Sequence, residues 1–345
     1  MVKIKDVADA AGVSTATVSR VLANKPHVKA EVRKRVLAVV KELDYQPNRV
    51  AQSLRSNTSK IIALIVSDIE NPFFQSVSRA VDDTALELGF NVMLCNTDED
   101  IEREKKCLDL LRVENVAGII ISPTKKGVAN FTETYTLDMP MVMIDRHVSN
   151  FDVDNVLIDN VSSAHKIVSH LVEHGYRRIA GIFGAESTTG LERQEGFLKA
   201  LKDHNIKPVQ ELIKFTDPTE EKGYATAMKL LQHTNRPEAI FTSNSLLASG
   251  VLLAIRKKNL TIPDDIAVVS FDDTTWANLI DPALTVIEQP TYEIGRTATE
   301  MLIKRISDPT RSIREVVLKT RLIVRQSCGC QATDGNDDLR GSRIR

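Results

Sequence analysis

Polar and aromatic side chains recur directly after short apolar, β-branched segments between residues 61 and 290. Carboxylate, amide and guanidinium groups offer paired hydrogen-bonding atoms, which suit a sugar ring because each hydroxyl both donates and accepts. Aromatic faces suit the C–H side of the same ring. Each such residue alone is more simply a loop cap or a surface ion pair, but recurrence at strand ends favours a shared site. The expected ligand contacts are Asp68, Asn71, Phe73, Phe74, Asp145, Arg146, Arg193, Asn244, Asp272, Trp276 and Gln289.

The same residues support a catalytic function less well than a ligand-binding function. The chain contains no Gly-x-Ser-x-Gly elbow and no phosphate-binding P-loop. Asp145 and Asp272 could form a glycosidase-like carboxylate pair, but both are better used as hydroxyl acceptors. We therefore expect a binding protein that has no catalytic residues and no cofactor.

Two short motifs could hold a metal ion. His170 and His174 stand four residues apart, as two ligands on one face of a helix would. Cys328 and Cys330 form a Cys-x-Cys pair close to a polar C-terminal segment. The histidine pair has no apparent third ligand, and a Cys-x-Cys pair alone is weak evidence for metal. No metal site is therefore expected.

The beginning of the chain carries the features of a small DNA-binding domain, expected at residues 1–46. Val7 and Ala11 share one face of a first short helix, and Gly12 supplies a turn that needs a positive φ. Ser14 can cap a second helix through its hydroxyl. The outer face of that helix carries short side chains, which let its backbone enter a major groove. The expected DNA contacts of this head are Thr15, Ala16, Thr17, Ser19, Arg20, Asn24, His27 and Tyr45.

Charge is divided unevenly along the chain. The 345 residues include 45 Lys+Arg and 46 Asp+Glu, for a formal net charge of −1. Residues 1–60 hold 12 of the basic and 5 of the acidic residues, a balance of +7, which leaves −8 for the remainder. A basic head on an acidic body indicates that the head alone meets a polyanion, here double-stranded DNA. The alternative is an ordinary solvated charged face.

Residues 47–59 are expected to form a hinge helix and linker. Pro47 suits the first turn of a helix, and the segment from Pro47 to Arg55 is too short to be stable alone. Leu54 is unusual in a solvated linker. It either packs on the body or enters the minor groove between base steps and kinks the duplex. The expected hinge contacts with DNA are Asn48, Val50, Ala51 and Leu54.

From residue 60 onward, short β-branched runs alternate with longer amphipathic stretches. This alternation predicts parallel sheets with helices on both faces, and the number of units favours two lobes. The expected fold class is α/β, with an all-α helix-turn-helix head at the N-terminus and a two-lobed body that binds its ligand beyond the carboxyl ends of the strands. The expected strands are 61–66, 90–95, 117–121, 141–144, 155–158, 178–183, 239–241 and 266–271.

The body is expected to span residues 60–330, with lobe one at about 60–159 and 289–325 and lobe two at about 160–288. Residues 331–345 are polar and aperiodic and are expected to be a disordered tail. No apolar run is long enough to cross a bilayer, no secretory signal is visible, and four cysteines do not make a disulfide framework. These features favour the cytoplasm, and the missing signal argues against a sugar-transport receptor.

In combination, the N-terminal segments resemble the lactose-repressor (LacI/GalR) family of bacterial transcription regulators, and the resemblance extends over residues 3 to about 330. The motifs that carry it are Lys5-Asp6-Val7-Ala8, Gly12-Val13-Ser14, Thr17-Val18-Ser19-Arg20-Val21, Glu42-Leu43-Asp44-Tyr45-Gln46-Pro47-Asn48 and Ala51-Gln52-Ser53-Leu54. The resemblance implies that Arg20 reads a guanine, that Thr15 and Ala16 tune operator choice, and that Leu54 is the minor-groove wedge. It also implies a homodimer on a pseudo-palindromic operator. The absence of leucine heptads after residue 325 favours a dimer over a tetramer.

The body resembles the periplasmic sugar-binding-protein fold, which implies a monosaccharide effector with ribose as first choice. A purine or nucleoside effector, or a phosphoprotein corepressor, is the alternative. Two positions depart from the pattern. Pro218 stands where a stacking aromatic residue is common, so that Phe215 or Trp276 would compensate, and Ser245 stands where Asp usually follows Asn244. The residues that match ribose-type ligand contacts are Asn71, Phe73, Phe74, Asp145, Arg146, Arg193, Asn244, Asp272 and Gln289.

Overall fold

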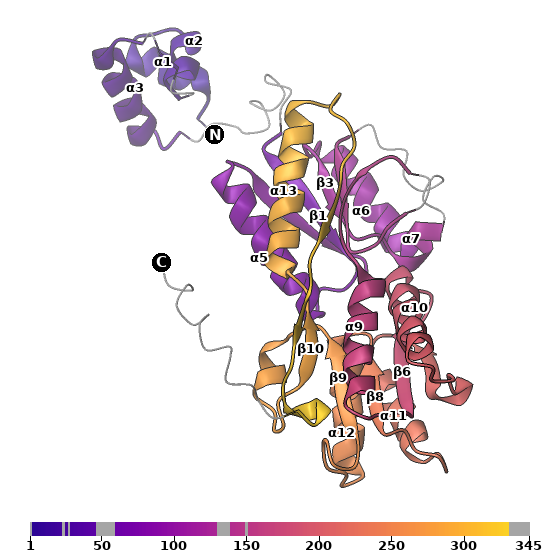
Figure 1. Cartoon of the computed structure of the whole chain (residues 1–345). Coiled ribbons are helices and arrows are strands. Elements are labelled where there is room, and N and C mark those ends of the chain that lie inside the picture. Colours follow the sequence, from indigo (N-terminus) through magenta and orange to yellow (C-terminus); the bar gives the residue numbers. More distant parts are fainter. Residues whose placement is uncertain are drawn as a thin grey trace. The chain divides into compact units, whose positions relative to one another are not determined.

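The computed structural model describes residues 2–22, 25–26, 28–45, 59–129, 139–148 and 151–330. The chain divides into two compact units, a head that ends at Ser59 and a body that begins at Lys60 (Figure 1). In the described ranges, no helix is long and apolar enough to cross a membrane. Several predictions fall outside these ranges: the residues concerned are Asn24, His27, Asn48, Val50, Ala51, Leu54 and the segment 331–345.

The head consists of three short helices, α1 (Ile4–Ala11), α2 (Thr15–Leu22) and α3 (Ala30–Glu42). Gly12 ends α1 with φ +62°, a left-handed conformation that glycine adopts without strain. At the start of α2, Ser14 Oγ accepts a hydrogen bond from Thr17 N at 3.2 Å. The small apolar core is formed by Val7, Ala8, Ala11, Val18, Val21 and Val36. The predicted all-α helix-turn-helix head is confirmed.

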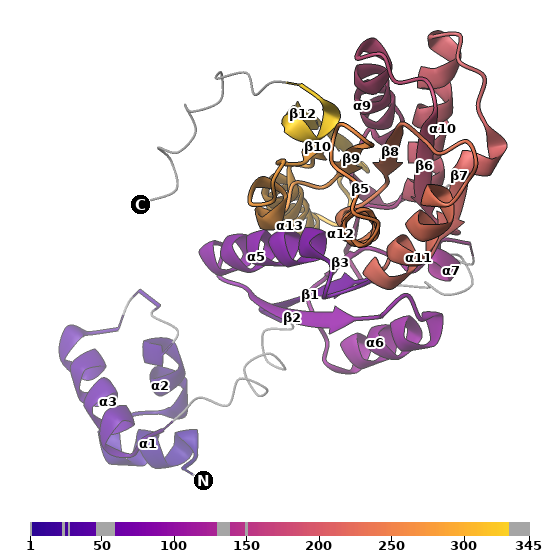
Figure 2. The ribbon, with the colours of Figure 1, turned by 90° about the horizontal axis from the view of Figure 1, so that it is seen from below.

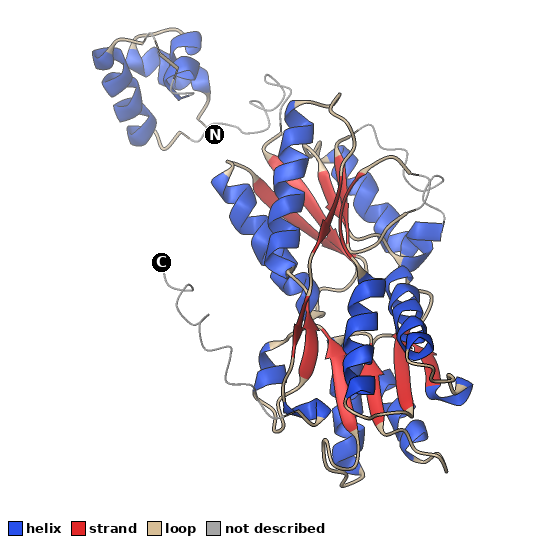
Figure 3. Cartoon of the chain, viewed as in Figure 1, coloured by secondary structure: helices blue, strands red, loops and turns tan. Residues whose placement is uncertain are grey.

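The first lobe of the body is built on a six-stranded sheet in which every pair is parallel (Figure 3). The order across it is β11–β5–β4–β3–β1–β2. Its strands are β1 (Ile61–Val66), β2 (Asn91–Asn96), β3 (Ile119–Ile121), β4 (Met141–Ile144), β5 (Asp154–Ile158) and β11 (Glu315–Leu318).

The second lobe is built on another six-stranded sheet, of order β12–β10–β9–β8–β6–β7. Its pairs are parallel except for β12, which lies antiparallel to β10 at the edge. Its strands are β6 (Ile179–Gly184), β7 (Ile213–Thr216), β8 (Ala239–Thr242), β9 (Ala267–Phe271), β10 (Thr285–Glu288) and β12 (Arg321–Ile323). The α/β body with predominantly parallel sheets is confirmed.

Helices cover both faces of each sheet (Figure 2). They pack in pairs, α5 on α13, α9 on α10 and α11 on α12. Each pair closes over a glycine: a Cβ at Gly196 would collide with Val161 O, one at Gly250 with Glu220 O, and one at Gly295 with Val77 O. The helices are α5 (Pro72–Glu87), α6 (Ile101–Val113), α7 (Lys125–Ala129), α9 (Asn160–Glu173), α10 (Thr188–Asp203), α11 (Glu220–Leu231), α12 (Ser245–Lys257) and α13 (Thr291–Ser307), with short 3-10 turns η1 (Gln210–Leu212), η2 (Thr275–Asn278) and η3 (Gln326–Cys328).

The chain passes between the lobes three times, after β5, after β10 and after β11. The last crossing corrects the predicted lobe boundary at residue 325. Strand β12 pairs with β10, with Val286 opposite Ile323, so residues 321–325 belong with the second lobe. The reason is that an antiparallel edge strand completes the second sheet where β10 would otherwise be exposed.

Candidate functional site

A cavity of about 460 Å³ lies between the two lobes of the body, beyond the carboxyl ends of both sheets. Ten of the eleven predicted ligand contacts line it. Trp276 is the exception and that placement is wrong: its half-buried ring packs against the apolar core of the second lobe and lines other surface hollows. Phe215 does not line the cavity either, whereas Pro218 does. The role of the ten lining residues in ligand binding remains a prediction.

The aromatic wall of the cavity is set by the start of α5. Asn71 caps the helix by accepting a hydrogen bond from Phe73 N at 3.0 Å, and Pro72 occupies the first helical position. This start buries the rings of Phe73 and Phe74, which meet edge to face with centroids 5.0 Å apart. Packing fixes both rings, so the cavity has a rigid apolar wall.

Two aspartates stand at equivalent positions in the two lobes. Asp145 follows β4 with φ +67°, and Asp272 follows β9 with φ +72°. Such left-handed conformations are strained for residues other than glycine and are concentrated at functional sites. Burial raises the pKa of both carboxyls above the ordinary value, although the Arg193 guanidinium opposes the shift in each case.

Arg193 enters the cavity from α10 in the second lobe. Its Nε donates to Asn160 Oδ1 at 2.8 Å, and its Nη1 donates to the Ser243 carbonyl oxygen. The guanidinium also lies 4.0 Å from the centroid of the Phe271 ring, which it stacks over. In the described part of the chain Nη2 has no hydrogen-bond partner, so the side chain is held rigidly while one edge stays available to a ligand.

Asp272 belongs to a small hydrogen-bonded group. Gln289 Nε2 donates to its Oδ1 at 2.6 Å, and Ser245 N donates to its Oδ2 at 3.3 Å. Asn244 caps α12 by accepting from Leu247 N at 2.9 Å. These bonds fix the orientation of three polar side chains at one end of the cavity.

Glu99 is a cavity residue that sequence reasoning missed. It has φ +57° and accepts hydrogen bonds from both terminal nitrogens of Arg146, one of them at 3.0 Å. Lys125 N donates to the same carboxylate at 3.0 Å. Burial opposes ionisation, but these bonds outweigh it and lower the pKa of Glu99 below its ordinary value. Glu99 therefore fixes the Arg146 side chain in the wall.

We expect Glu99→Gln to lower the free energy of unfolding by about 2 kcal/mol, because a buried charged hydrogen bond is lost. The pKa of Glu99 is lower in the folded state than its ordinary value of 4.5. Its carboxylate therefore contributes to the free energy of unfolding above pH 4.5, and this contribution is lost as pH falls through the folded-state pKa. The loss should therefore be larger at pH 7 than near pH 4, as followed by urea unfolding. The matched control is Glu102→Gln, whose exposed pair with Lys105 contributes little. Equal losses in both variants would contradict the prediction.

The charges around the cavity indicate the kind of ligand that it can hold. Its lining includes three basic residues, Lys125, Arg146 and Arg193. The acidic residues outnumber them by three, which disfavours an anionic ligand. Those acidic residues are Asp68, Asp98, Glu99, Asp145, Asp217 and Asp272. Neutral polyhydroxy compounds fit this lining better than phosphorylated ones.

The head presents its predicted contacts on α2. Thr15, Ala16 and Arg20 are exposed, and Thr17 and Ser19 are partly buried. Tyr45 differs in that it packs partly buried against the core of the head. The exposed face of α2 is thus free to approach DNA, with Arg20 as its cation.

Comparison with known proteins agrees with both units. Residues 3–48 match the family of bacterial regulatory proteins called the lacI family, and residues 168–328 match the periplasmic binding protein-like domain. The ribose operon repressor of Halalkalibacterium halodurans is 38% identical over 95% of this chain and 97% of its own length. The transcriptional repressor PurR of Mannheimia succiniciproducens is 33% identical over 95% of this chain and 98% of its own length.

Solved structures show the same architecture. The lac repressor dimer bound to operator and the anti-inducer ONPF matches with a TM-score of 0.86 and 28% identity, over 95% of this chain and 99% of that chain. A helix-turn-helix head together with a cavity between two α/β lobes defines a DNA-binding regulator with an effector-binding body. The chain belongs to the lacI family of bacterial regulatory proteins.

Proposed function

We propose that this protein is a cytoplasmic repressor, not an enzyme, that binds a pseudo-palindromic operator as a homodimer and releases it when ribose enters the cavity between the lobes. The main supporting observation is that Asn71 and Asp145 from one lobe and Arg193 and Asp272 from the other line a single cavity of about 460 Å³. The 38% identity to the ribose operon repressor of H. halodurans favours ribose among the monosaccharides.

Release follows from the position of the cavity. A ligand that bonds to both lobes stabilises the closed arrangement over the open one, by the difference between its affinities for the two states. Closure changes the angle between the lobes, and we propose that this unsettles the hinge helices across the dimer. The coupling is reciprocal, so bound operator must weaken ribose binding by the same factor.

The experiment measures operator affinity by fluorescence anisotropy, with a duplex selected from a random pool by the full-length protein. We expect ribose to weaken operator binding by about tenfold or more, within the usual range of allosteric coupling. Arabinose and glucose serve as matched sugars. An unchanged affinity at saturating ribose, with ribose binding shown by a raised Tm, would contradict release.

A purine or nucleoside effector is the second candidate, because PurR proteins are among the relatives, at 33% identity or more. A purine or nucleoside effector would raise the Tm of the protein on addition of hypoxanthine or guanosine, whereas ribose would leave the Tm unchanged. If such a ligand strengthens operator binding, the effector is a corepressor and the proposed sign is wrong.

We expect Arg20→Ala to lower operator affinity by about tenfold and to relax the preference for one G·C pair, because a bidentate base contact is lost. The test compares the affinity of the parent and the variant for operators in which that G·C pair is replaced. Arg35→Ala, which removes an exposed arginine of α3, is the control. It should weaken binding to all duplexes alike and leave the base preference intact.

Leu54→Ala tests the proposed minor-groove wedge. A smaller side chain cannot hold a base step open, so we expect about a tenfold weaker operator complex and a smaller bend in the DNA. Circular-permutation gel shifts report the bend. If operator affinity and DNA bend are both unchanged, Leu54 is not a wedge. That result would leave the proposed contacts of the helix-turn-helix head with DNA untested.

A further inference from the structure

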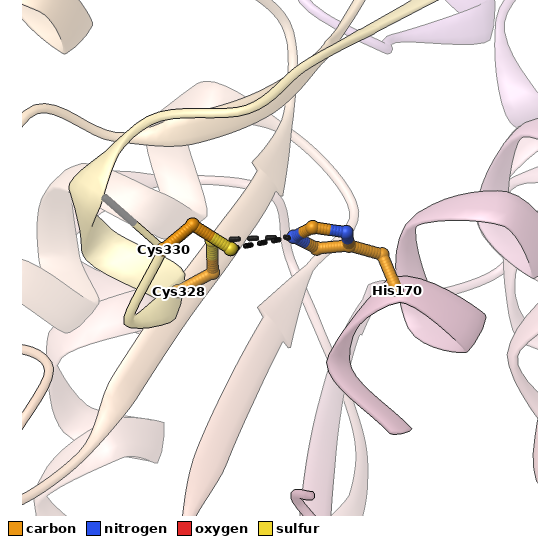
Figure 4. Close-up of side chains that lie close together, drawn as sticks. All are labelled: His170, Cys328 and Cys330. Atoms are coloured by element: carbon orange, nitrogen blue, oxygen red, sulfur yellow. Dashed lines mark hydrogen bonds between the residues drawn. The ribbon is translucent and has the colours of Figure 1, made fainter. Parts of the chain in front are cut away.

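A cluster of one histidine and two cysteines lies in the second lobe, outside the effector cavity. His170 comes from the last turn of α9, Cys328 from η3, and Cys330 from the residue after Gly329. Figure 4 shows both sulfur atoms close to the same imidazole nitrogen. The fold has therefore brought together two motifs that are 158 residues apart and that are each inconclusive in the sequence.

The spacing of the three ligand atoms is close to that of a tetrahedral metal site. His170 Nε2 lies 3.3 Å from Cys328 Sγ and 3.5 Å from Cys330 Sγ, and the sulfur atoms are 3.2 Å apart. Zinc bonds of about 2.3 Å to sulfur and 2.0 Å to nitrogen give edges of about 3.5 Å between S and N and about 3.8 Å between the two S atoms. Shifts of a few tenths of an ångström would complete the geometry.

We propose that His170, Cys328 and Cys330 bind a zinc ion that fastens η3 to α9. This goes beyond the proposed regulation by ribose and does not depend on it. Two thiolates and a neutral imidazole form a typical soft donor set for Zn²⁺, and their two negative charges balance the ion in a largely buried place. Among the described residues the cluster offers three ligands, and a water molecule completes the tetrahedron.

The surroundings hold the cysteines in place. Thr285 Oγ1 donates to Cys328 Sγ at 3.2 Å, and Tyr176 Oη donates to the Cys328 carbonyl oxygen at 3.2 Å. Gly329 has φ +86°, and a Cβ there would lie 3.0 Å from the Tyr176 hydroxyl. Glycine between the two cysteines thus permits the turn that directs both sulfur atoms to His170.

The histidine is supported in the same way. His174 Nδ1 lies 2.7 Å from the His170 carbonyl oxygen, and the two imidazole rings are 4.2 Å apart. His174 therefore packs beside His170, and Cys328 and Cys330 supply the other two ligand atoms of the cluster.

The surroundings of the two cysteines shift their pKa values in opposite directions. Burial opposes ionisation of Cys328, but hydrogen bonds from His170 and Thr285 lower its pKa to about 6. Burial and the neighbouring Cys328 sulfur raise the pKa of Cys330 to about 12. Zinc binds both sulfur atoms as thiolates, so each Zn–S bond that forms at a protonated cysteine releases one proton.

The test is titration of the reduced, metal-free, full-length protein with Zn²⁺ and with Co²⁺. We expect one ion per chain, near-ultraviolet thiolate-to-cobalt charge transfer, tetrahedral visible bands, and a raised Tm. Cys330→Ser and His170→Gln should each weaken zinc binding by about 100-fold or more, because a ligand is removed. Cys107→Ser, which changes a partly buried cysteine of the first lobe, is the matched control and should bind like the parent.

Three outcomes would overturn the proposal. One is cobalt binding without a charge-transfer band, and another is unchanged zinc affinity in both ligand variants, each shown by circular dichroism to be folded. The third is a Cys328–Cys330 disulfide whose reduction yields a protein that binds no zinc, which would make the pair a redox couple. None of these results bears on ribose, because the cavity residues are different.

Discussion

Arg193→Ala is expected to abolish the response to ribose and to leave operator binding intact. Arg193 is 5% exposed, and its guanidinium is anchored by Asn160 and the Ser243 carbonyl and presents its remaining edge to the cavity. Its loss removes a charged, bidentate donor and leaves the Asp272 carboxylate without its neighbouring cation. We expect ribose affinity to fall by about 100-fold or more, since buried charged hydrogen bonds contribute about 2–5 kcal/mol. Isothermal titration calorimetry measures this directly.

Two further variants separate binding from folding. Arg193→Lys keeps the charge but lacks the planar fork, so it should recover part of the affinity. Arg79→Ala removes an exposed arginine of α5 and should change neither ribose nor operator binding. If Arg193→Ala retains parental ribose affinity in a folded protein, the cavity is not the ribose site. Operator binding by the same preparation shows that the chain is folded.

Asp272→Asn is expected to lower ribose affinity by about 100-fold while stabilising the ligand-free protein. The substitution keeps the size of the side chain but removes a charged hydroxyl acceptor, which accounts for the lost affinity. Burial raises the pKa of Asp272, so the folded state disfavours the ionised carboxylate. A neutral amide avoids that cost, and it keeps a hydrogen bond to Gln289 when the Gln289 amide turns to present its oxygen, so we expect Tm to rise by roughly 2 °C at pH 7.

The pH dependence has a definite sign. The pKa of Asp272 is higher in the folded state than its ordinary value of 3.8. Its protonated carboxyl therefore contributes to the free energy of unfolding below pH 3.8, and this contribution is lost as pH rises through the folded-state pKa. The Tm advantage of Asp272→Asn should therefore shrink as pH falls from 7 toward 4. Asp109→Asn, at a surface position, controls for the general effect of charge removal. A stability loss at pH 7, or an advantage that grows on acidification, contradicts this account.

The sequence indicated those parts of the structure that depend on local pattern. Most sheet strands are buried β-branched runs, and the polar residues directly after them reach one cavity because parallel strands end at the same edge. Strands β7, β10, β11 and β12 were not predicted. Strand β10 is buried but only four residues long, whereas β7, β11 and β12 are largely exposed or partly exposed and carry charged residues. Such edge strands are specified by their partners in the sheet.

Side-chain partners distant in the chain were not accessible from the sequence. Glu99 gains its role only through Arg146, 47 residues later. Trp276 was wrongly placed because η2 turns its ring toward the second lobe's core, a choice made by packing. The meeting of His170 with Cys328 likewise depends on how β12 and η3 return to the second lobe.

The three crossings between the lobes also have a consequence for synthesis on the ribosome. The first lobe needs α13 to cover α5 and β11 to pair with β5, and both are translated after the whole of residues 160–288. Some 160 residues separate the end of β5 from the end of β11. The first lobe therefore stays incomplete on the ribosome, with the apolar face of α5 uncovered, while these residues are synthesised. Contacts at such long range slow folding and leave apolar surface open to aggregation until α13 and β11 are in place.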